Sequence, residues 1–256
     1  MKIARLSLEQ GPRFAVLDEA TEGYHVLAGD PMYSGYERTG QIVAGADARL
    51  VAPMIPRSKV VGLGANFTSD DDERAALRSK GMSLFLKPNT SVVGPESAII
   101  VPSWAKDVQY EAELAIVIGK ICKDVPVERA SEVIFGYTVA NDVTDAAALR
   151  EDGDAVRGKS FDTSTPLGPV IETDLDTAAL AIRSRLNGEP KQNGTTADMV
   201  RNCAELVSEV SAIFTLLPGD VIITGTPLGG GPLAAGDVVE VEVEGIGTLV
   251  NRVELA

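Results

Sequence analysis

The chain has 256 residues, of which 45% are hydrophobic and 23% are charged, with a formal net charge of −14. This composition is ordinary for a globular protein, and the length suits either one large domain or a large domain with a small additional one. The acidic balance argues against nucleic acid or an anionic membrane surface as a partner, because both would repel the protein.

The N-terminal sequence, the cysteines and the single histidine limit the function further. The start MKIARLSLEQ lacks the apolar core of a signal peptide, and no apolar run approaches 18 residues, so we expect a cytoplasmic protein. Cys122 and Cys203 have no metal-ligand spacing, and we interpret both as small buried residues in a reducing compartment. His25 is the only histidine, which excludes a site with two histidine ligands and disfavours a Ser/His/Asp triad.

The first part of the chain predicts a small β-rich domain at residues 1–55. Its short strand patterns are broken by Gly, Pro and Asp, and a turn between Pro53 and Pro56 ends it. The strand patterns lie at residues 2–6, 14–17 and 23–26. Residues 56–256 then form the larger domain.

The larger domain begins with a buried-strand pattern at residues 59–63. The Gly62-x-Gly64 sequence at its end lacks the third glycine of a dinucleotide-binding fingerprint, so we reject that function. A short helix is predicted at residues 69–80, with Ser69 as its N-cap and aspartates in its first turn. This helix has few apolar residues to bury, which fits a mobile lid or a frayed surface segment equally well.

The remaining segments predict mainly strands, so the fold class is mixed α/β with mostly β structure. Residues 161–167 are polar and predict a loop, whereas apolar residues spaced by three and four from Met199 to Leu217 predict an amphipathic helix that ends at Pro218-Gly219. The Asn187-Gly188 pair predicts a hairpin turn. Strands are expected at residues 83–87, 98–101, 110–118, 133–140, 170–173, 180–186, 189–193, 221–224, 238–244 and 248–255.

Three carboxylates follow the strand pattern at a spacing that suits a metal ion. Glu111 and Glu113 are two residues apart on an extended run, so they project to the same face about 6.6 Å apart, and Asp142 comes at the end of the next strand. Three converging carboxylates would repel by roughly 4 kcal/mol per pair, and a hard divalent ion, Mg²⁺ or Mn²⁺, would relieve this. The alternative is two solvated glutamates on an outward face.

Two other segments carry polar groups that could act on a substrate. Lys159, between Gly158 and Ser160 in an expected loop, is placed to neutralise a substrate carboxylate or a developing anion, although it could also be an exposed lysine. Gly225 and Thr226 follow a strand, and the Thr226 hydroxyl could donate to a carboxylate or a carbonyl. The triple glycine at residues 229–231 predicts a flexible loop rather than a phosphate site, because no helix starts after it.

Together these segments resemble the fumarylacetoacetate hydrolase superfamily. The similarity spans roughly residues 60–255 in the order of the family's motifs. The matching segments are YEAELAIVIGK (110–120), GYTVANDV (136–143), RGKSFDTSTPLGP (157–169), LNGE (186–189), PGDVIITGTP (218–227) and VEVEVEGIGTLVNRV (239–253).

The resemblance implies a β-roll catalytic domain, usually in a homodimer, that binds Mg²⁺ or Mn²⁺ through Glu111, Glu113 and Asp142. It also implies a 2-oxo acid or 1,3-dicarbonyl substrate, chelated by the ion, with Lys159 stabilising the negative charge that develops. A carbon–carbon bond is then hydrolysed, or carbon dioxide is lost, through an enolate. Because a chelated cation stabilises an enolate more than the neutral ketone, the gain falls on the transition state.

The predicted lid departs from the family pattern. Hydrolytic members carry Asn-Tyr-x-x-His-x-x-Glu, in which the His/Glu pair activates water, whereas this chain has Phe67 for the tyrosine, Asp70 for the histidine and Glu73 in the expected place. We therefore expect Asp70 and Glu73 to be the only catalytic lid carboxylates and acylpyruvate hydrolysis to be weak or absent.

Two polar positions after the third metal ligand are also replaced, by Ala146 and Leu149. Arg150 or Arg157 could compensate from a neighbouring turn. We expect the substrate to contact Phe67, Arg157, Gly225 and Thr226.

Several functions remain open from the sequence alone. Within an enzyme of this superfamily, decarboxylation, keto–enol tautomerisation or a condensation needs only enolate stabilisation, whereas hydrolysis also needs a base. One alternative is a non-catalytic relative that binds a metal-chelating keto acid. Another is a pathway-specific enzyme for a larger, less polar substrate.

Overall fold

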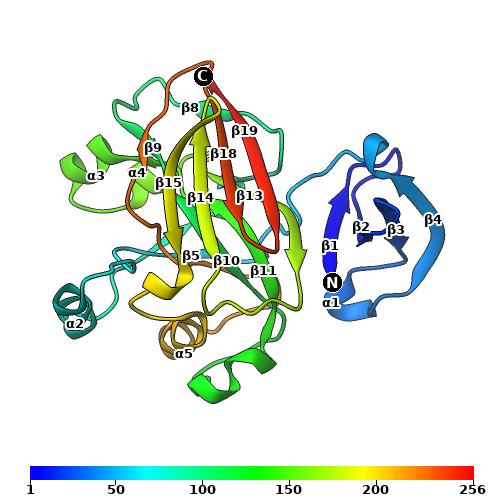
Figure 1. The fold of residues 1–256 in the computed structure, drawn as a ribbon, viewed down its shortest axis with the longest axis horizontal. Helices are drawn as coiled ribbons and strands as arrows, with labels where there is room; N and C mark the ends of the chain where they lie inside the picture. Colours follow the sequence, from blue (N-terminus) through cyan, green and yellow to red (C-terminus); the bar gives the residue numbers. More distant parts are fainter.

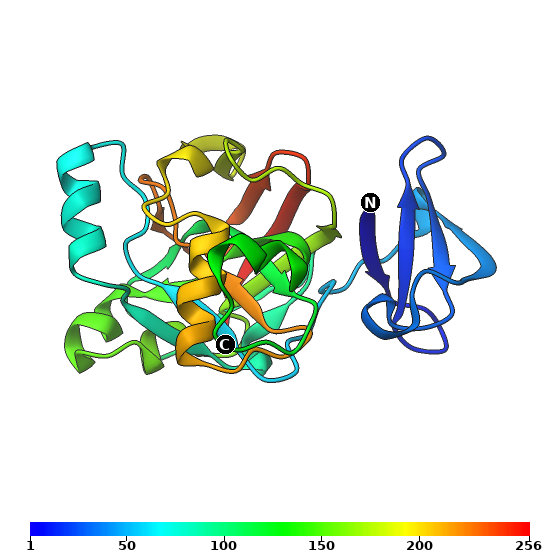
Figure 2. The same cartoon turned by 90° about the horizontal axis from the view of Figure 1, so that it is seen from below.

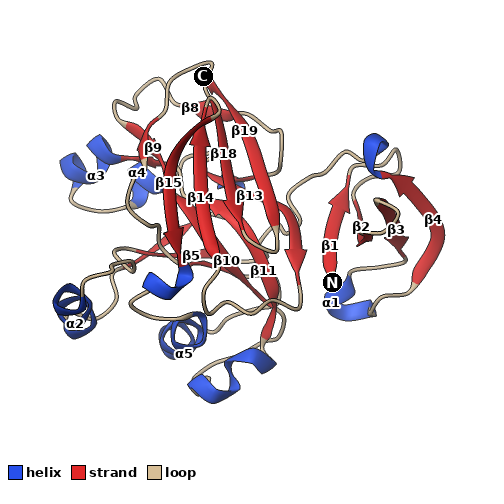
Figure 3. Ribbon diagram, in the orientation of Figure 1, coloured by secondary structure: helices blue, strands red, loops and turns tan.

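The computed structural model describes residues 1–256. The helices are α1 (Pro31–Ser34), α2 (Asp71–Ser79), α3 (Ala146–Asp152), α4 (Val156–Lys159) and α5 (Cys203–Ile213), with 3₁₀ turns at Gly45–Asp47, Asn89–Ser91, Val127–Glu132 and Thr196–Asp198. The strands are β1 (Lys2–Leu6), β2 (Arg13–Asp18), β3 (Gly23–Leu27), β4 (Arg38–Ala44), β5 (Val60–Leu63), β6 (Leu84–Lys87), β7 (Val92–Val93), β8 (Ile99–Val101), β9 (Val108–Tyr110), β10 (Ala112–Ile118), β11 (Ile134–Asn141), β12 (Thr144–Asp145), β13 (Thr165–Glu172), β14 (Ala181–Leu186), β15 (Glu189–Thr195), β16 (Val221–Ile223), β17 (Gly231–Pro232), β18 (Val238–Val243) and β19 (Gly247–Leu255). Strands dominate, as Figure 3 shows, which confirms the predicted fold class.

The strands form three sheets. The largest has the order β4-β3-β2-β1-β13-β11-β10-β16-β5-β6, with β7 beside β13, and the second has the order β15-β14-β18-β19-β8. A third sheet, β12-β9-β17, pairs Gly231 of β17 with Tyr110 of β9. None of the helices combines the length and the apolar character that crossing a membrane requires.

Strand β10 is an interior strand of the largest sheet. It pairs with β11 on one side and β16 on the other, and all seven of its residues are buried. Its sequence, AELAIVI, is apolar except for Glu113, as expected for a strand covered on both faces. Glu113 is therefore the one charged side chain that this strand carries into the interior.

Residues 1–44 form a four-stranded antiparallel unit that stands beside the main body (Figures 1 and 2). Two residue pairs, Lys2 with Glu172 and Ile3 with Ile171, join β1 to β13, so this unit extends the largest sheet. Strand β4 was not predicted, because its sequence, RTGQIVA, has no alternating pattern and six of its seven residues are exposed.

Two other elements differ from the prediction. Strand β13 starts at Thr165, where a loop was expected up to residue 167, because its polar start pairs with β7 and the Thr165 hydroxyl contacts the Ser91 hydroxyl at 2.7 Å. Helix α2 starts one residue later than predicted: Asp70, rather than Ser69, is its N-cap, and the Asp70 carboxylate accepts a hydrogen bond from the Glu73 amide.

Helix α5 is shorter than its apolar spacing predicts. It ends at Ile213 because Leu216 returns to extended chain and pairs with Cys122, and Met199 lies before it in a bridge with Phe67. Asn202 and Glu205 form a reciprocal capping box that fixes the start. The flanking residues pack on the same core without being helical.

We expect Asn202→Ala to lower the free energy of unfolding by about 1 kcal/mol, because the Glu205 amide loses its side-chain acceptor. Urea unfolding followed by circular dichroism measures this loss. Asn89→Ala, at an exposed asparagine whose side chain makes no hydrogen bond, is the matched control and should change stability by less than about 0.5 kcal/mol. Equal losses in the two variants would contradict the capping role.

Candidate metal centre

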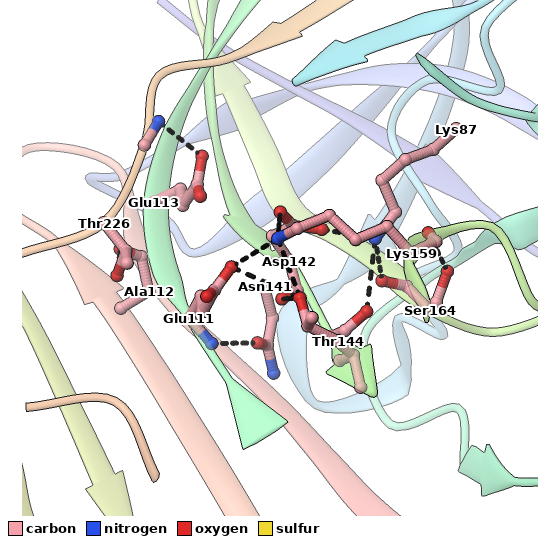
Figure 4. Close-up of polar contacts among 12 residues, drawn as sticks. Lys87, Glu111, Ala112, Glu113, Asn141, Asp142, Thr144, Lys159, Ser164 and Thr226 are labelled. Carbon is pink, nitrogen blue, oxygen red and sulfur yellow. Dashed lines mark hydrogen bonds and ion pairs between the residues drawn. The ribbon is translucent and has the colours of Figure 1, made fainter. Parts of the chain in front are cut away.

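The three predicted carboxylates meet at the start of β10. Glu111 lies between β9 and β10, Glu113 is on β10, and Asp142 directly follows β11. Ala112 pairs with Asn141 in the antiparallel ladder, and the Asp142 amide donates to the Glu111 carbonyl at 2.9 Å. One carboxylate oxygen from each residue lies within 4.8 Å of the others (Figure 4). The expected convergence is therefore present, although Glu111 itself interrupts the expected continuous strand.

Glu113 is a buried carboxylate without a cationic partner. It is 1% exposed, forms no ion pair, and accepts one hydrogen bond, from the Gly225 amide at 2.7 Å. Burial raises the pKa of Glu113 well above its ordinary value, and the nearby Asp142 and Glu111 carboxylates raise it further. A cluster of hard oxygen donors with one uncompensated charge fits Mg²⁺ or Mn²⁺.

Lys159 contacts two of these carboxylates, whereas its predicted contact with a substrate anion stays a prediction. It is the last residue of helix α4 rather than part of a loop, and its Nζ lies 2.7 Å from Glu111 Oε2, 2.5 Å from Asp142 Oδ2 and 2.8 Å from Thr144 Oγ1. Burial lowers the pKa of Lys159, but the Asp142 and Glu111 carboxylates outweigh this and hold the pKa above its ordinary value. The two carboxylates therefore favour the protonated form of Lys159.

The centre contains a second lysine, which was not predicted from the sequence. Lys87, at the end of β6, is 1% exposed, and its Nζ contacts Asp142 Oδ1 and donates to the Ser164 carbonyl at 2.8 Å. Burial lowers the pKa of Lys87 below its ordinary value, and the Asp142 carboxylate offsets only part of this effect. With three carboxylates and two ammonium groups ionised, the centre has an excess of one negative charge.

Gly225 and Thr226 form another wall of the centre. Gly225 has φ +88°, a conformation that favours glycine, and an added Cβ would lie 3.0 Å from Asn66 Cβ. The Thr226 hydroxyl donates to the Ala112 carbonyl at 2.8 Å and accepts from Gln192 Nε2 at 2.8 Å. Gln192, which no sequence motif indicated, therefore positions Thr226 from β15.

The predicted lid residues make no hydrogen bond or ion pair with the carboxylate cluster. Asp70 Oδ1 accepts from the Glu73 amide at 2.8 Å, and Glu73 Oε2 accepts from the Thr68 hydroxyl at 2.5 Å. Phe67 forms a main-chain bridge with Met199. No residue of α2 is buried, and the helix is held to the body by polar contacts of Arg74 with the Met199 carbonyl and of Arg78 with Glu205. Closure of α2 as a lid would require these contacts to rearrange.

The two arginines considered for the substrate pocket are both paired with acidic side chains. Arg157 contacts Asp152 at 2.6 Å and Glu151 at 3.2 Å, and Arg150 contacts Asp107 at 2.9 Å. The Arg157 guanidinium also lies 5.4 Å from the ring centre of Trp104. The structure therefore does not bring Arg157 to the cluster formed by Glu111, Glu113 and Asp142. Its contact with a substrate stays a prediction.

Comparison with known proteins places this chain in a family. The model of the fumarylacetoacetate (FAA) hydrolase C-terminal domain matches residues 59–254, and the Rv2993c-like N-terminal model matches residues 1–53. The chain is 35% identical over 223 residues to the mitochondrial oxaloacetate tautomerase Fahd2a of Rattus norvegicus, covering 83% of this chain and 71% of that protein.

Two solved structures are similar over the full length of both chains. One is 5-carboxymethyl-2-hydroxymuconate delta-isomerase from Mycobacterium smegmatis, with a TM-score of 0.91 and 40% identity. The other is maleylpyruvate hydrolase from Sphingobium sp. SYK-6 in complex with manganese (II) ion and pyruvate, with a TM-score of 0.81 and 27% identity.

The fold and the acidic centre thus define an enzyme whose relatives include isomerases, hydrolases and tautomerases of small molecules. The chain belongs to the fumarylacetoacetate hydrolase family.

Proposed function

We propose that the protein is a divalent-metal-dependent enzyme that interconverts the keto and enol forms of a 2-oxo acid. The observation that carries the proposal is the buried Glu113 carboxylate, which has no cationic partner and lies within 4.8 Å of Glu111 and Asp142 oxygens. These three residues would hold Mg²⁺ or Mn²⁺. When bound, the ion withdraws electrons from the 2-oxo-carboxylate and acidifies the neighbouring carbon.

The reaction breaks the C3–H bond of the keto form. Its electrons form the C2–C3 double bond, and the 2-oxo oxygen takes up a proton. The Lys159 ammonium, fixed by Glu111, Asp142 and Thr144, stabilises the negative charge that develops on this oxygen. Because Lys159 is held protonated, it does not act as the base. We assign that role to Glu73, which would reach the substrate when α2 closes over the centre.

The position of the only histidine favours tautomerisation over hydrolysis. His25 is on β3 of the N-terminal unit, 3.8 Å from Asp18, so no imidazole can activate water beside the lid. Asp70, which replaces the lid histidine of hydrolytic relatives, is used as the cap of α2. Hydrolysis of an acylpyruvate is the second candidate, with Glu73 alone as its base. A homodimer is our expectation from the family, and light scattering tests it.

We expect Glu73→Gln to reduce the tautomerisation rate by at least about 100-fold. An amide can neither accept the C3 proton when the enol forms nor return a proton to C3 when the enol decays. The decay of enol absorbance of phenylpyruvate, a 2-oxo acid with one carboxylate, in the presence of Mn²⁺ measures this rate. Asp72→Asn on the same helix is the control for the change in charge. Rapid cleavage of acetylpyruvate that depends on Glu73 would instead favour hydrolysis. An unchanged tautomerisation rate in the Glu73→Gln variant would exclude Glu73 as the base.

A further inference from the structure

A cavity of about 190 Å³ is lined by segments that lie next to residues of the carboxylate centre in the sequence. Its lining includes Phe67, Thr68, Asn193, Asp198, Pro227 and Leu228. It is therefore built from the segment that leads into α2, the hairpin strand β15, the 3₁₀ turn after it, and the loop after β16.

Two walls of the cavity continue from residues that build the centre, and a third continues from Asn66, which bonds to the residue before Gly225. Gly225 donates to Glu113, and Pro227 follows two residues later. Gln192 bonds Thr226, and the next residue is Asn193. Asn66 Nδ2 donates to the Thr224 carbonyl at 2.8 Å, and the next residue is Phe67. The cavity thus adjoins the place where the chelating end of a 2-oxo acid would bind, on the side of Glu113.

The charge of the cavity is negative. Asp198 is its only ionisable lining residue, and its carboxylate forms no ion pair and accepts no side-chain or main-chain hydrogen bond. Behind Thr68 lies another carboxylate, that of Glu73. The basic side chain that contacts Thr68 is Arg74, and it donates to the main-chain carbonyls of Thr68 and Met199. No basic side chain therefore lines the cavity.

The rim of the cavity is apolar on one side. Leu228 is 94% exposed at the start of the glycine-rich loop, and Pro227 and Phe67 lie near it in the lining. An exposed leucine gains free energy when a hydrocarbon segment covers it. The cavity therefore offers apolar contact together with one free acceptor, the Asp198 carboxylate.

We infer that this cavity receives the distal end of the substrate, and that Asp198 selects an uncharged group with a hydrogen-bond donor over a carboxylate. The inference rests on the proposed function and narrows its substrate class to 2-oxo acids with a single carboxylate. The physical reason is that a second carboxylate would lie beside Asp198 without a cation, whereas an amide or hydroxyl can donate to it.

The test compares 2-oxoadipate with its 6-amide, which differ in the charge of the distal group. Enolisation is followed as exchange of the C3 hydrogens with D₂O by NMR, and binding to the Mn²⁺-loaded protein is measured separately by calorimetry. We expect the amide to exceed the dicarboxylate at least about tenfold in kcat/KM and in affinity. Asp198→Asn should bring both ratios close to one, mainly by improving the dicarboxylate. Glu128→Gln, at an exposed glutamate on a distant 3₁₀ turn, makes the same change in net charge and should leave both ratios unchanged.

The two readouts separate this inference from the proposed function. A tenfold binding preference that Asp198→Asn removes, without any exchange, would support the distal cavity and overturn the tautomerase. Exchange of both compounds at equal kcat/KM would support the tautomerase and overturn the role of Asp198. Equal affinities, or binding of neither compound, would likewise overturn the cavity assignment.

Discussion

Glu113→Gln is expected to stabilise the metal-free protein and to abolish its response to Mn²⁺. In the metal-free protein the ionised Glu113 is buried beside Asp142 and Glu111 and has no cationic partner, whereas glutamine has the same shape and no charge. We expect a gain of about 2 kcal/mol at pH 8, which corresponds to a rise in Tm of about 4 to 8 °C for a chain of this size. Calorimetry after chelator treatment measures it.

The pH dependence of this gain has a defined sign. A carboxylic acid whose folded-state pKa is raised binds its proton more tightly in the native protein than in the unfolded chain, so wild-type stability falls as pH rises from the ordinary value of 4.5 through the raised one. The advantage of Glu113→Gln is therefore largest above the raised pKa and disappears toward pH 4.5.

Added Mn²⁺ should reverse the order of the Tm values of wild type and the Glu113→Gln variant. Millimolar Mn²⁺ raises the Tm of wild type, because the ion binds only the folded state, and leaves the Tm of Glu113→Gln unchanged. Glu209→Gln removes a carboxylate that lies outside the centre and is the matched control, with a wild-type metal response. A Glu113→Gln protein that is less stable than metal-free wild type at pH 8, or that still responds to Mn²⁺, would contradict the assignment.

Lys159→Met is expected to lower tautomerase activity by about 100- to 1,000-fold while the protein keeps or increases its affinity for Mn²⁺. The ammonium stabilises the negative charge that develops on the substrate, so its loss falls on the transition state. The same ammonium neutralises Glu111 and Asp142, and without it these carboxylates attract a divalent ion more strongly. Enol decay and Mn²⁺ titration by electron paramagnetic resonance measure the two effects.

A loss of activity without a loss of Mn²⁺ affinity distinguishes Lys159 from a merely structural residue. A variant that only misfolds would lose activity and metal affinity together. Lys106→Met removes an exposed lysine paired with Glu151 and should change neither quantity by more than about threefold. Activity within threefold of wild type in Lys159→Met would remove this lysine from the mechanism.

The acidic cluster could be predicted from the sequence because it depends on local rules. Glu111 and Glu113 are separated by the strand repeat, and Asp142 ends the strand that pairs with theirs, so one hairpin-like ladder brings all three together. The motif order then indicated the family. Lys159 could be included because it follows these strands within a recognisable segment.

Lys87 and Gln192 could not be found in this way. Lys87 reaches Asp142 over 55 residues of sequence, and a lysine at the end of a short strand is usually exposed. Gln192 acts through β15, whose sequence, EPKQNGT, has no pattern that distinguishes its one buried side chain. Strand β4 was not predicted, and the ends of α5 were predicted wrongly, for a related reason. Pairing with distant segments, rather than local periodicity, decides where those elements begin and end.

The glycine-rich segment between β16 and β17 is hydrogen-bonded at both ends to the chain that carries the acidic cluster. Gly225 holds the Glu113 side chain, and Gly231 pairs with Tyr110, the residue before Glu111. Leu228 is thus connected to both glutamates through one piece of backbone. By thermodynamic linkage, any change that a ligand in the neighbouring cavity makes in the affinity for an ion at the glutamates would be matched by an equal change that the ion makes in the affinity for that ligand.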